Sequence, residues 1–325
     1  MKVLVIDDDP AILDLVSQYL SLSAQYDVQS VATARDALEA VKQAETPFDV
    51  FLVDIQMPGV DGITLIEFIR EAEGYRETPI VMLTAMQEKS YLDRAFSAGA
   101  TDYITKPFDF LDLRQRLEDA KARVAERDVA RRELPDGAGA EVVGLHDPVA
   151  LPDVESAIDY GEFENYVRQL MSQRLYRATA IAVKIAGVGQ IHGALSGEAF
   201  REVLRDVALA AEKSLLPAGG LLTYRGNGVF LCIPENRLMG RRAAMQKALN
   251  KQFARDYPAS ARLAPTLLIG DQVPLGDGKG VSLLATLAKA VDSLEGQHAG
   301  IGEILDKPKR FLRGQGRYDV SFGAE

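Results

Sequence analysis

Residues 50–62 read VFLVDIQMPGVDG, and this stretch decides the fold of the first part of the chain. Val50–Val53 is a continuous apolar run, which is typical of a strand buried on both faces of a parallel sheet. Asp54 follows at the end of this strand, and Ile63–Glu71 then has the pattern of a helix. The stretch therefore predicts one strand–helix unit of an α/β domain.

The same alternation extends on both sides of this unit. The expected strands are Val3–Ile6, Val28–Val31, Val50–Val53, Ile80–Leu83 and Asp102–Thr105. The expected helices are Ala11–Ser21, Ala34–Ala44, Ile63–Glu71, Gln87–Ala98 and a long one that starts near Asp109. Five strands that alternate with five helices predict a doubly wound parallel sheet.

Polar residues stand where several of these strands end, which is the edge where such sheets bind ligands. They are Asp7, Asp8, Asp54, Thr84 and Lys106. Three carboxylates at one edge repel one another unless a cation holds them, and oxygen ligands of this kind suit Mg²⁺. The lysine could pair with an added phosphoryl charge, and the threonine hydroxyl could donate to it.

The motifs VIDDDP, VDIQMPGVDG, LTA and KPF, in this order and spacing over roughly residues 1–125, resemble the receiver domain of two-component response regulators. The resemblance implies a flavodoxin-like fold and phosphorylation of Asp54 by a histidine kinase or a phosphotransfer protein. It also implies that Asp8, Asp54 and the backbone carbonyl of Gln56 bind Mg²⁺, while Asp7 acts mainly through water.

By the same resemblance, Thr84 and Lys106 hold the phosphoryl group. Tyr103 matches the aromatic switch position, whose side chain turns inward when Thr84 moves toward the phosphate. The alternative for Tyr103 is an ordinary residue of an amphipathic strand.

The fifth helix continues its apolar spacing through Phe110, Leu113, Leu117, Ala120 and Val124, beyond the expected end of the sheet. It could form a short coiled coil between two protomers, or it could be a charged extension stabilised by its own Glu and Arg neighbours. We expect the first domain at 1–125 with this helix extended to about 134, a Pro- and Gly-rich linker at 135–153, a second domain at 154–300 and a tail at 301–325.

The second half has an α+β order with a central hairpin. The expected helices are Glu155–Arg177, Gly197–Leu216, Gly240–Phe253 and Val281–Leu294, and strands are expected at Ala180–Ile185 and Pro265–Gly270 and on both sides of the turn in YRGNGVFLCIP at 224–234. This order resembles the GGDEF domain of diguanylate cyclases, which join two GTP molecules with the help of carboxylate-bound Mg²⁺.

The second half departs from that family at the positions that bind the metal, the guanine base and the inhibitory product. Asn227 and Gly228 stand in place of two acids of the signature turn, and Lys184 stands in place of the other metal-binding acid. His192 and Arg201 replace the two residues that read guanine. The usual inhibitory product site is absent at Leu216–Gly219, and Gly296 replaces a late lysine. The resemblance therefore implies a degenerate domain without cyclase activity, which acts by protein–protein interaction or dimerisation. A guanine-nucleotide or cyclic di-GMP sensor is the alternative, and an active cyclase is a third.

The composition limits the partners. The net charge of −10 argues against nonspecific DNA binding through a basic surface, and we expect no DNA partner. The sequence shows neither a long apolar run nor a secretory signal, and its one cysteine, Cys232, fits a reducing compartment. We therefore expect a cytoplasmic homodimer, away from membranes, with a downstream protein partner that the sequence does not name. The histidines, His146, His192 and His298, show no metal-ligand spacing.

Overall fold

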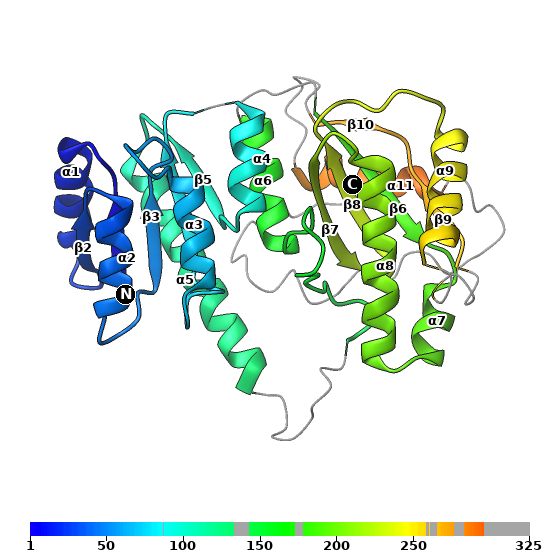
Figure 1. Ribbon diagram of the computed structural model, residues 1–325, viewed down its shortest axis with the longest axis horizontal. Coiled ribbons are helices and arrows are strands. Elements are labelled where there is room, and N and C mark those ends of the chain that lie inside the picture. The colour runs from blue at the N-terminus through cyan, green and yellow to red at the C-terminus, as the bar shows by residue number, and fades with distance from the viewer. Residues whose placement is uncertain are drawn as a thin grey trace, which may run out of the picture.

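The computed structural model shows two β-sheets that lie in separate parts of the chain (Figure 1). It describes residues 1–86, 88–132, 143–172, 178–257, 260, 265–275 and 283–295. We call residues 1–132 the first domain and residues 143–295 the second domain. None of the helices in these ranges is long and apolar enough to cross a bilayer.

The first domain is a parallel five-stranded sheet with the strand order β2-β1-β3-β4-β5. The strands are β1 (Lys2–Ile6), β2 (Asp27–Val31), β3 (Val50–Val53), β4 (Ile80–Thr84) and β5 (Asp102–Thr105). The helices are α1 (Pro10–Ser21), α2 (Ala34–Gln43), α3 (Gly62–Glu71), α4 (Lys89–Ser97) and α5 (Phe110–Arg132). This order is the flavodoxin-like one, and it confirms the predicted doubly wound sheet.

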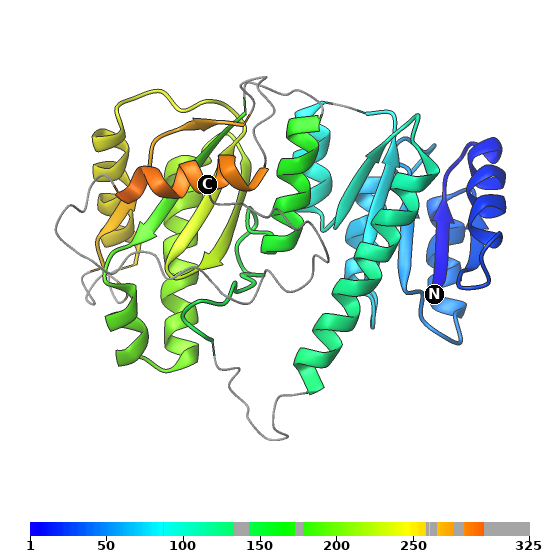
Figure 2. The ribbon, with the colours of Figure 1, turned by 180° about the vertical axis from the view of Figure 1, so that it is seen from behind.

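Helices cover both faces of this sheet (Figure 2). One face packs on α1 and α5, whose buried residues include Val16, Leu20, Leu113 and Leu117. The other face packs on α2, α3 and α4. Side chains fix where two of the helices begin: Asp9 accepts a hydrogen bond from the Ala11 amide before α1, and Asp61 accepts one from the Thr64 amide before α3.

The second domain has an antiparallel sheet in the order β10-β6-β8-β7, with β9 also paired to β6. The strands are β6 (Thr179–Ile185), β7 (Gly220–Gly226), β8 (Val229–Pro234), β9 (Leu267–Ile269) and β10 (Val273–Pro274). The helices are α6 (Tyr160–Ser172), α7 (Val188–Ala194), α8 (Gly197–Leu215), α9 (Arg242–Asp256) and α11 (Leu283–Glu295). The run β6-α8-β7-β8-α9-β9 has the split βαβ connectivity of a ferredoxin-like sheet.

Two sequence expectations for this half need correction. The helix expected from Glu155 begins only at Tyr160, because the preceding backbone pairs with β7: the Ile158 amide donates to the Leu222 carbonyl, and the Leu222 amide donates to the Ser156 carbonyl. The short helix α7 and the strand β10 were not predicted. Residues 143–153, which the sequence analysis assigned to a linker, lie on the second domain, where Val143 and Leu151 join its core.

Some expectations fall on residues that the structure does not describe. They include residues 135–142 of the linker, the tail at 301–325, Gly296 and His298, and the last residue of the long helix, Leu134. Whether two copies of α5 pair through a coiled coil stays a prediction.

Candidate functional site

An acidic cluster lies at the carboxyl edge of the first sheet. The strands β1 and β3 are neighbours, so Asp7 and Asp8 after β1 meet Asp54 after β3. One carboxylate oxygen from each residue lies within 4.8 Å of the others. Asp7 and Asp54 are buried, whereas Asp8 is exposed. The cluster is therefore open to solvent on the side of Asp8.

Lys106 enters the same cluster from the end of β5. Its Nζ lies 2.6 Å from Oδ2 of Asp7 and 3.3 Å from Oδ2 of Asp54. The Lys106 amide donates to the Thr84 carbonyl over 2.8 Å, and this bond fixes the start of the loop after β5. The single ammonium group offsets only part of the charge of three carboxylates.

The second oxygen of Asp54 identifies the place where a ligand would bind. Oδ1 of Asp54 is buried, and no described group makes a hydrogen bond of ordinary geometry to it, although the Gln56 amide lies close enough to the carboxylate to oppose the rise in its pKa. Burial, helped by the charge of Asp7 and opposed by Lys106, raises the pKa of Asp54 above its ordinary value. A divalent cation would give Oδ1 a partner and would favour the charged form of Asp54, because it is a hard acid that binds carboxylate oxygens. Asp7, Asp8 and Asp54 thus fit Mg²⁺, and the role predicted for the Gln56 carbonyl stays a prediction.

Glycine at position 62 brings α3 close to the acidic residue. A Cβ atom at Gly62 would lie 1.9 Å from the backbone carbonyl oxygen of Asp54. The Gly62 amide donates to the Ile55 carbonyl over 2.9 Å. Any larger residue at position 62 would push the helix away from the Asp54 backbone.

Thr84 and Tyr103 are joined through Met86. Thr84 is fully buried at the end of β4, and its Oγ1 accepts a hydrogen bond from the Met86 amide over 3.2 Å. The Tyr103 hydroxyl donates to the Met86 carbonyl over 2.5 Å. The Tyr103 ring is fully buried and points inward, and this burial, together with the charge of Asp54, raises its pKa. The two residues predicted to couple are therefore connected by one intervening residue.

The residues expected at a cyclase site surround the tip of the β7–β8 hairpin. Lys184, only 6% exposed, donates from Nζ to the backbone carbonyl of Asn227. Burial lowers the pKa of Lys184 to about 8. Asn227 adopts a positive φ of 51°, as the second residue of a tight hairpin turn often does. The Lys184 amine, from the neighbouring strand β6, thus bonds to the turn of the hairpin.

A segment that precedes the second sheet covers this hairpin tip. The Asn227 amide donates to the Leu145 carbonyl over 2.6 Å, and a Cβ atom at Gly226 would lie 2.4 Å from the His146 carbonyl oxygen. Nε2 of His192 lies 2.7 Å from the carbonyl oxygen of Val143. We call residues 143–147 the covering segment, because it contacts the hairpin tip at Gly226 and Asn227.

Gly228, which the cyclase resemblance aligns with a metal-binding acid, has no room for a side chain. A Cβ atom at Gly228 would approach the side-chain atoms of Val188 to between 2.9 and 3.0 Å. Arg201 lies on α8 and is partly buried. The turn and the helix α7 are therefore packed closely together at Gly228.

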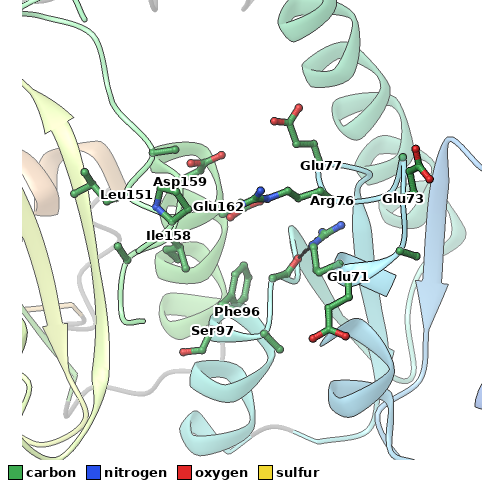
Figure 3. Close-up of a pocket in the computed structure, with 18 residues that line it drawn as sticks. Glu71, Glu73, Arg76, Glu77, Phe96, Ser97, Leu151, Ile158, Asp159 and Glu162 are labelled. Carbon is green, nitrogen blue, oxygen red and sulfur yellow. Dashed lines mark hydrogen bonds between the residues drawn. The ribbon is translucent and has the colours of Figure 1, made fainter. Parts of the chain in front are cut away.

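A cleft of about 750 Å³ opens between the two domains at the other edge of the first sheet, away from Asp54. Both acidic and basic side chains line this cleft. Arg76 extends toward Glu162 of α6 (Figure 3). The lining residues from the first domain precede β4 and β5 in the chain, whereas Asp54, Thr84 and Lys106 lie at or just after the carboxyl ends of their strands. The cleft is thus separate from the acidic cluster.

Three residues that the sequence analysis did not single out form a polar contact between the domains. They are Asp93 on α4, Tyr166 on α6 and Glu235 after β8. Asp93 and Tyr166 are buried, and the Tyr166 hydroxyl donates to Oδ1 of Asp93 over 2.5 Å. The only available sequence signal was the Lys89–Asp93 spacing of an ordinary surface ion pair, so their role could not be predicted.

Comparison with known proteins identifies the first domain. Residues 3–118 match the family described as the response regulator receiver domain. A stretch of 116 residues is 38% identical to the DNA-binding dual master transcriptional regulator RpaA of Synechocystis, covering 36% of this chain and 47% of RpaA. A stretch of 109 residues is 37% identical to the signal transduction histidine-protein kinase BarA of Shigella flexneri, covering 34% of this chain and 12% of BarA.

Among solved structures, the chemotaxis response regulator CheY4 of Vibrio cholerae is 34% identical, with 37% of this chain and 97% of that chain covered and a TM-score of 0.34. The chain spans about half the length of the first curated relatives it matches, 47% of RpaA and 48% of the regulatory protein VanR of Enterococcus faecium. The expectation that DNA is no partner receives no support from these relatives, since RpaA is described as DNA-binding.

Proposed function

We propose, from the premise that residues 3–118 are a response regulator receiver domain, that the chain is a response regulator phosphorylated on Asp54. The observation that carries this proposal is the buried Oδ1 of Asp54, which has no hydrogen bond of ordinary geometry among the described residues and lies beside Asp7, Asp8 and Lys106. Its partner would be a histidine kinase or a phosphotransfer protein that carries a phosphohistidine.

In the transfer, an Asp54 carboxylate oxygen attacks phosphorus, and the bond from phosphorus to the imidazole nitrogen breaks as the new P–O bond forms. Bound Mg²⁺ would neutralise phosphoryl charge at this edge. Lys106, already within 3.3 Å of Asp54, would pair with a phosphoryl oxygen. The Thr84 hydroxyl would donate to another.

This part of the proposal is tested by incubating the full chain with Mg²⁺ and acetyl phosphate and measuring its intact mass. One phosphoryl increment is expected on the wild type and none on Asp54→Ala. Asp27→Ala, which removes an exposed carboxylate of β2, is the matched control and keeps the adduct. An equal adduct on Asp54→Ala would show that another residue accepts the phosphoryl group.

For the second domain we propose a degenerate GGDEF-like output module that acts by protein–protein interaction or dimerisation and not by catalysis. The split βαβ connectivity supports the resemblance. Three contacts favour the loss of catalysis: Lys184 of β6 bonds to the carbonyl of Asn227 in the turn, Gly228 packs against Val188, and the covering segment contacts the turn. The DNA-binding description of RpaA belongs to that protein, less than half of which is matched.

The same three contacts weigh against the alternative of a nucleotide sensor that uses this turn. Incubation of the phosphorylated chain with GTP and Mg²⁺ should yield no cyclic di-GMP, and calorimetric titration with either nucleotide should give no binding heat. Formation of cyclic di-GMP would overturn the non-catalytic proposal. Micromolar binding that is lost on Lys184→Met would favour the sensor.

A further inference from the structure

The helix α6 of the second domain packs on α4 and β5 of the receiver domain, and the two helices lie side by side in both views (Figures 1 and 2). The ring of Tyr166 meets the ring of Phe96 edge-on, with 5.4 Å between centroids. Phe163, Tyr166 and Phe96 are all fully buried. The contact is therefore a closely packed apolar one, as in a protein interior.

Directed polar bonds fix the position of α6 within this contact. The Tyr166 hydroxyl donates to Asp93, and Nδ2 of Asn165 donates to the Thr101 carbonyl over 2.8 Å. Lys89 pairs with Asp93 and lies 3.5 Å from Glu235 of the second domain. Since a buried polar group that loses its partner is costly, these bonds hold α6 in one register on the receiver domain.

The receiver side of this contact is connected to the phosphorylation site. Met86 bonds Thr84 through its amide and Tyr103 through its carbonyl, and α4 begins three residues after Met86. Tyr103 is on β5, the edge strand of the sheet, and the Thr101 carbonyl bonded by Asn165 is next to this strand. Tyr103 belongs to the same buried apolar cluster as Phe163 and Tyr166 of α6, so the inward ring is part of the packing between the two domains.

We propose that α6 is the intramolecular partner of the α4–β5 surface and that phosphorylation of Asp54 strengthens this docking. A phosphoryl oxygen that draws the Thr84 hydroxyl would stabilise the inward Tyr103, and the docked α6 requires the inward Tyr103. Phosphorylation of Asp54 and docking of α6 then favour each other. While α6 is docked, the α4–β5 surface is closed to a second copy of the chain. This inference rests on the proposed phosphorylation of Asp54.

The test is hydrogen–deuterium exchange of the full chain, with and without acetyl phosphate, with the intact mass measured on the same samples. Phosphorylation should slow exchange in peptides from α4 and α6. Tyr166→Phe, which removes only the hydroxyl, should speed exchange in these peptides by about tenfold, the size expected when a buried polar group loses its hydrogen-bond partner. Asn165→Ala should have a similar effect through loss of the Thr101 bond.

Tyr160→Phe is the matched control, because its hydroxyl faces Glu164 and Arg225 within the second domain. It should leave exchange in α4 unchanged. If the wild type takes up no phosphoryl group, the proposed function fails. If the adduct forms while exchange in α4 and α6 stays the same or becomes faster, the function stands and the docking inference is overturned. Equal exchange in Tyr166→Phe and wild type would also overturn it.

Discussion

Lys184 is a buried amine that donates to the backbone carbonyl of Asn227, and no carboxylate pairs with its positive charge among the described residues. Its pKa of about 8 is below the ordinary 10.5, so the folded state binds the proton more weakly than the unfolded state. At about 1.4 kcal/mol for each tenfold change, the charged amine costs up to about 3 kcal/mol at pH 7. The stability of the wild type therefore increases as the pH rises from about 8 to about 10.5.

We predict that Lys184→Met raises the free energy of unfolding at pH 7 by about 1–3 kcal/mol, because the charge is removed while the side-chain volume is kept. Urea unfolding at several pH values measures this gain, which should shrink as the pH approaches 10.5. The matched control is Lys251→Met at an exposed position of α9, for which no change is expected. A loss of stability in Lys184→Met would mean that the bond to Asn227 outweighs the burial of charge.

The hairpin tip offers a second prediction at the residue scale. Gly226 and Gly240 both have positive φ, 101° and 129°, but only Gly226 lies under the covering segment. Gly226→Ala should therefore lose at least about 1 kcal/mol more stability than Gly240→Ala, which has nothing within 4 Å of the new Cβ. Thermal unfolding of the two variants measures the difference, and equal losses would argue against the position of residues 143–147.

The polar residues at the carboxyl edge of the first sheet could be placed from the sequence, because each ends or follows a strand with a clear apolar pattern. Asp54 and Thr84 are examples, and the sheet order then brings them together. Asp93 and Tyr166 could not be predicted in the same way, because their meeting depends on how two domains pack. No local pattern encodes such a contact between residues far apart in the chain.

At the scale of elements, Arg70 holds three segments of the receiver domain together. From the end of α3 it donates to the carbonyls of Tyr75, Thr78 and Gly99, which lie before β4 and β5. Arg70→Lys keeps the charge but loses the planar fork, so we predict a loss of about 2–4 kcal/mol in the free energy of unfolding. Arg35→Lys on the exposed side of α2 is the control. A loss below 1 kcal/mol would contradict this role.

The elements of the receiver domain were predicted with bounds within one or two residues, since its strands are short apolar runs separated by amphipathic helices. The bounds of the elements in the second domain were harder to predict. The helix α7 spans only Val188–Ala194, too short for a helical period to show. The start of α6 was misplaced because residues 156–158 have helical composition, yet their backbone groups bond to β7.

At the scale of the whole molecule, the contact of the two domains should depend on pH. Burial, with Glu235 next to it, raises the pKa of Asp93 to about 7, while Lys89 and the Tyr166 hydroxyl oppose the rise. With the domains apart, Asp93 would titrate near its ordinary value of about 3.9. Docking then takes up a proton, so it should strengthen as the pH falls from about 7 to about 4 and be weakest above about 7.

Energy transfer between dyes on cysteines introduced at the exposed positions Lys42 and Lys251 measures this docking, since Cys232 is buried. Asp93→Asn keeps an acceptor for Tyr166 but cannot titrate, so its transfer efficiency should no longer change between pH 7 and pH 4. Asp119→Asn on exposed α5 should behave as the wild type. A wild-type signal that is flat over this range would exclude proton-linked docking.

The apolar cluster that joins both domains has a consequence for how the chain melts. Residues as far apart as Leu4 in β1 and Leu294 in α11 belong to one connected cluster that crosses the domain boundary at Phe96 and Tyr166. Heat should therefore unfold both halves in a single calorimetric transition. Beryllofluoride with Mg²⁺, bound only at Asp54, should then raise the melting temperature of the second domain as much as that of the first.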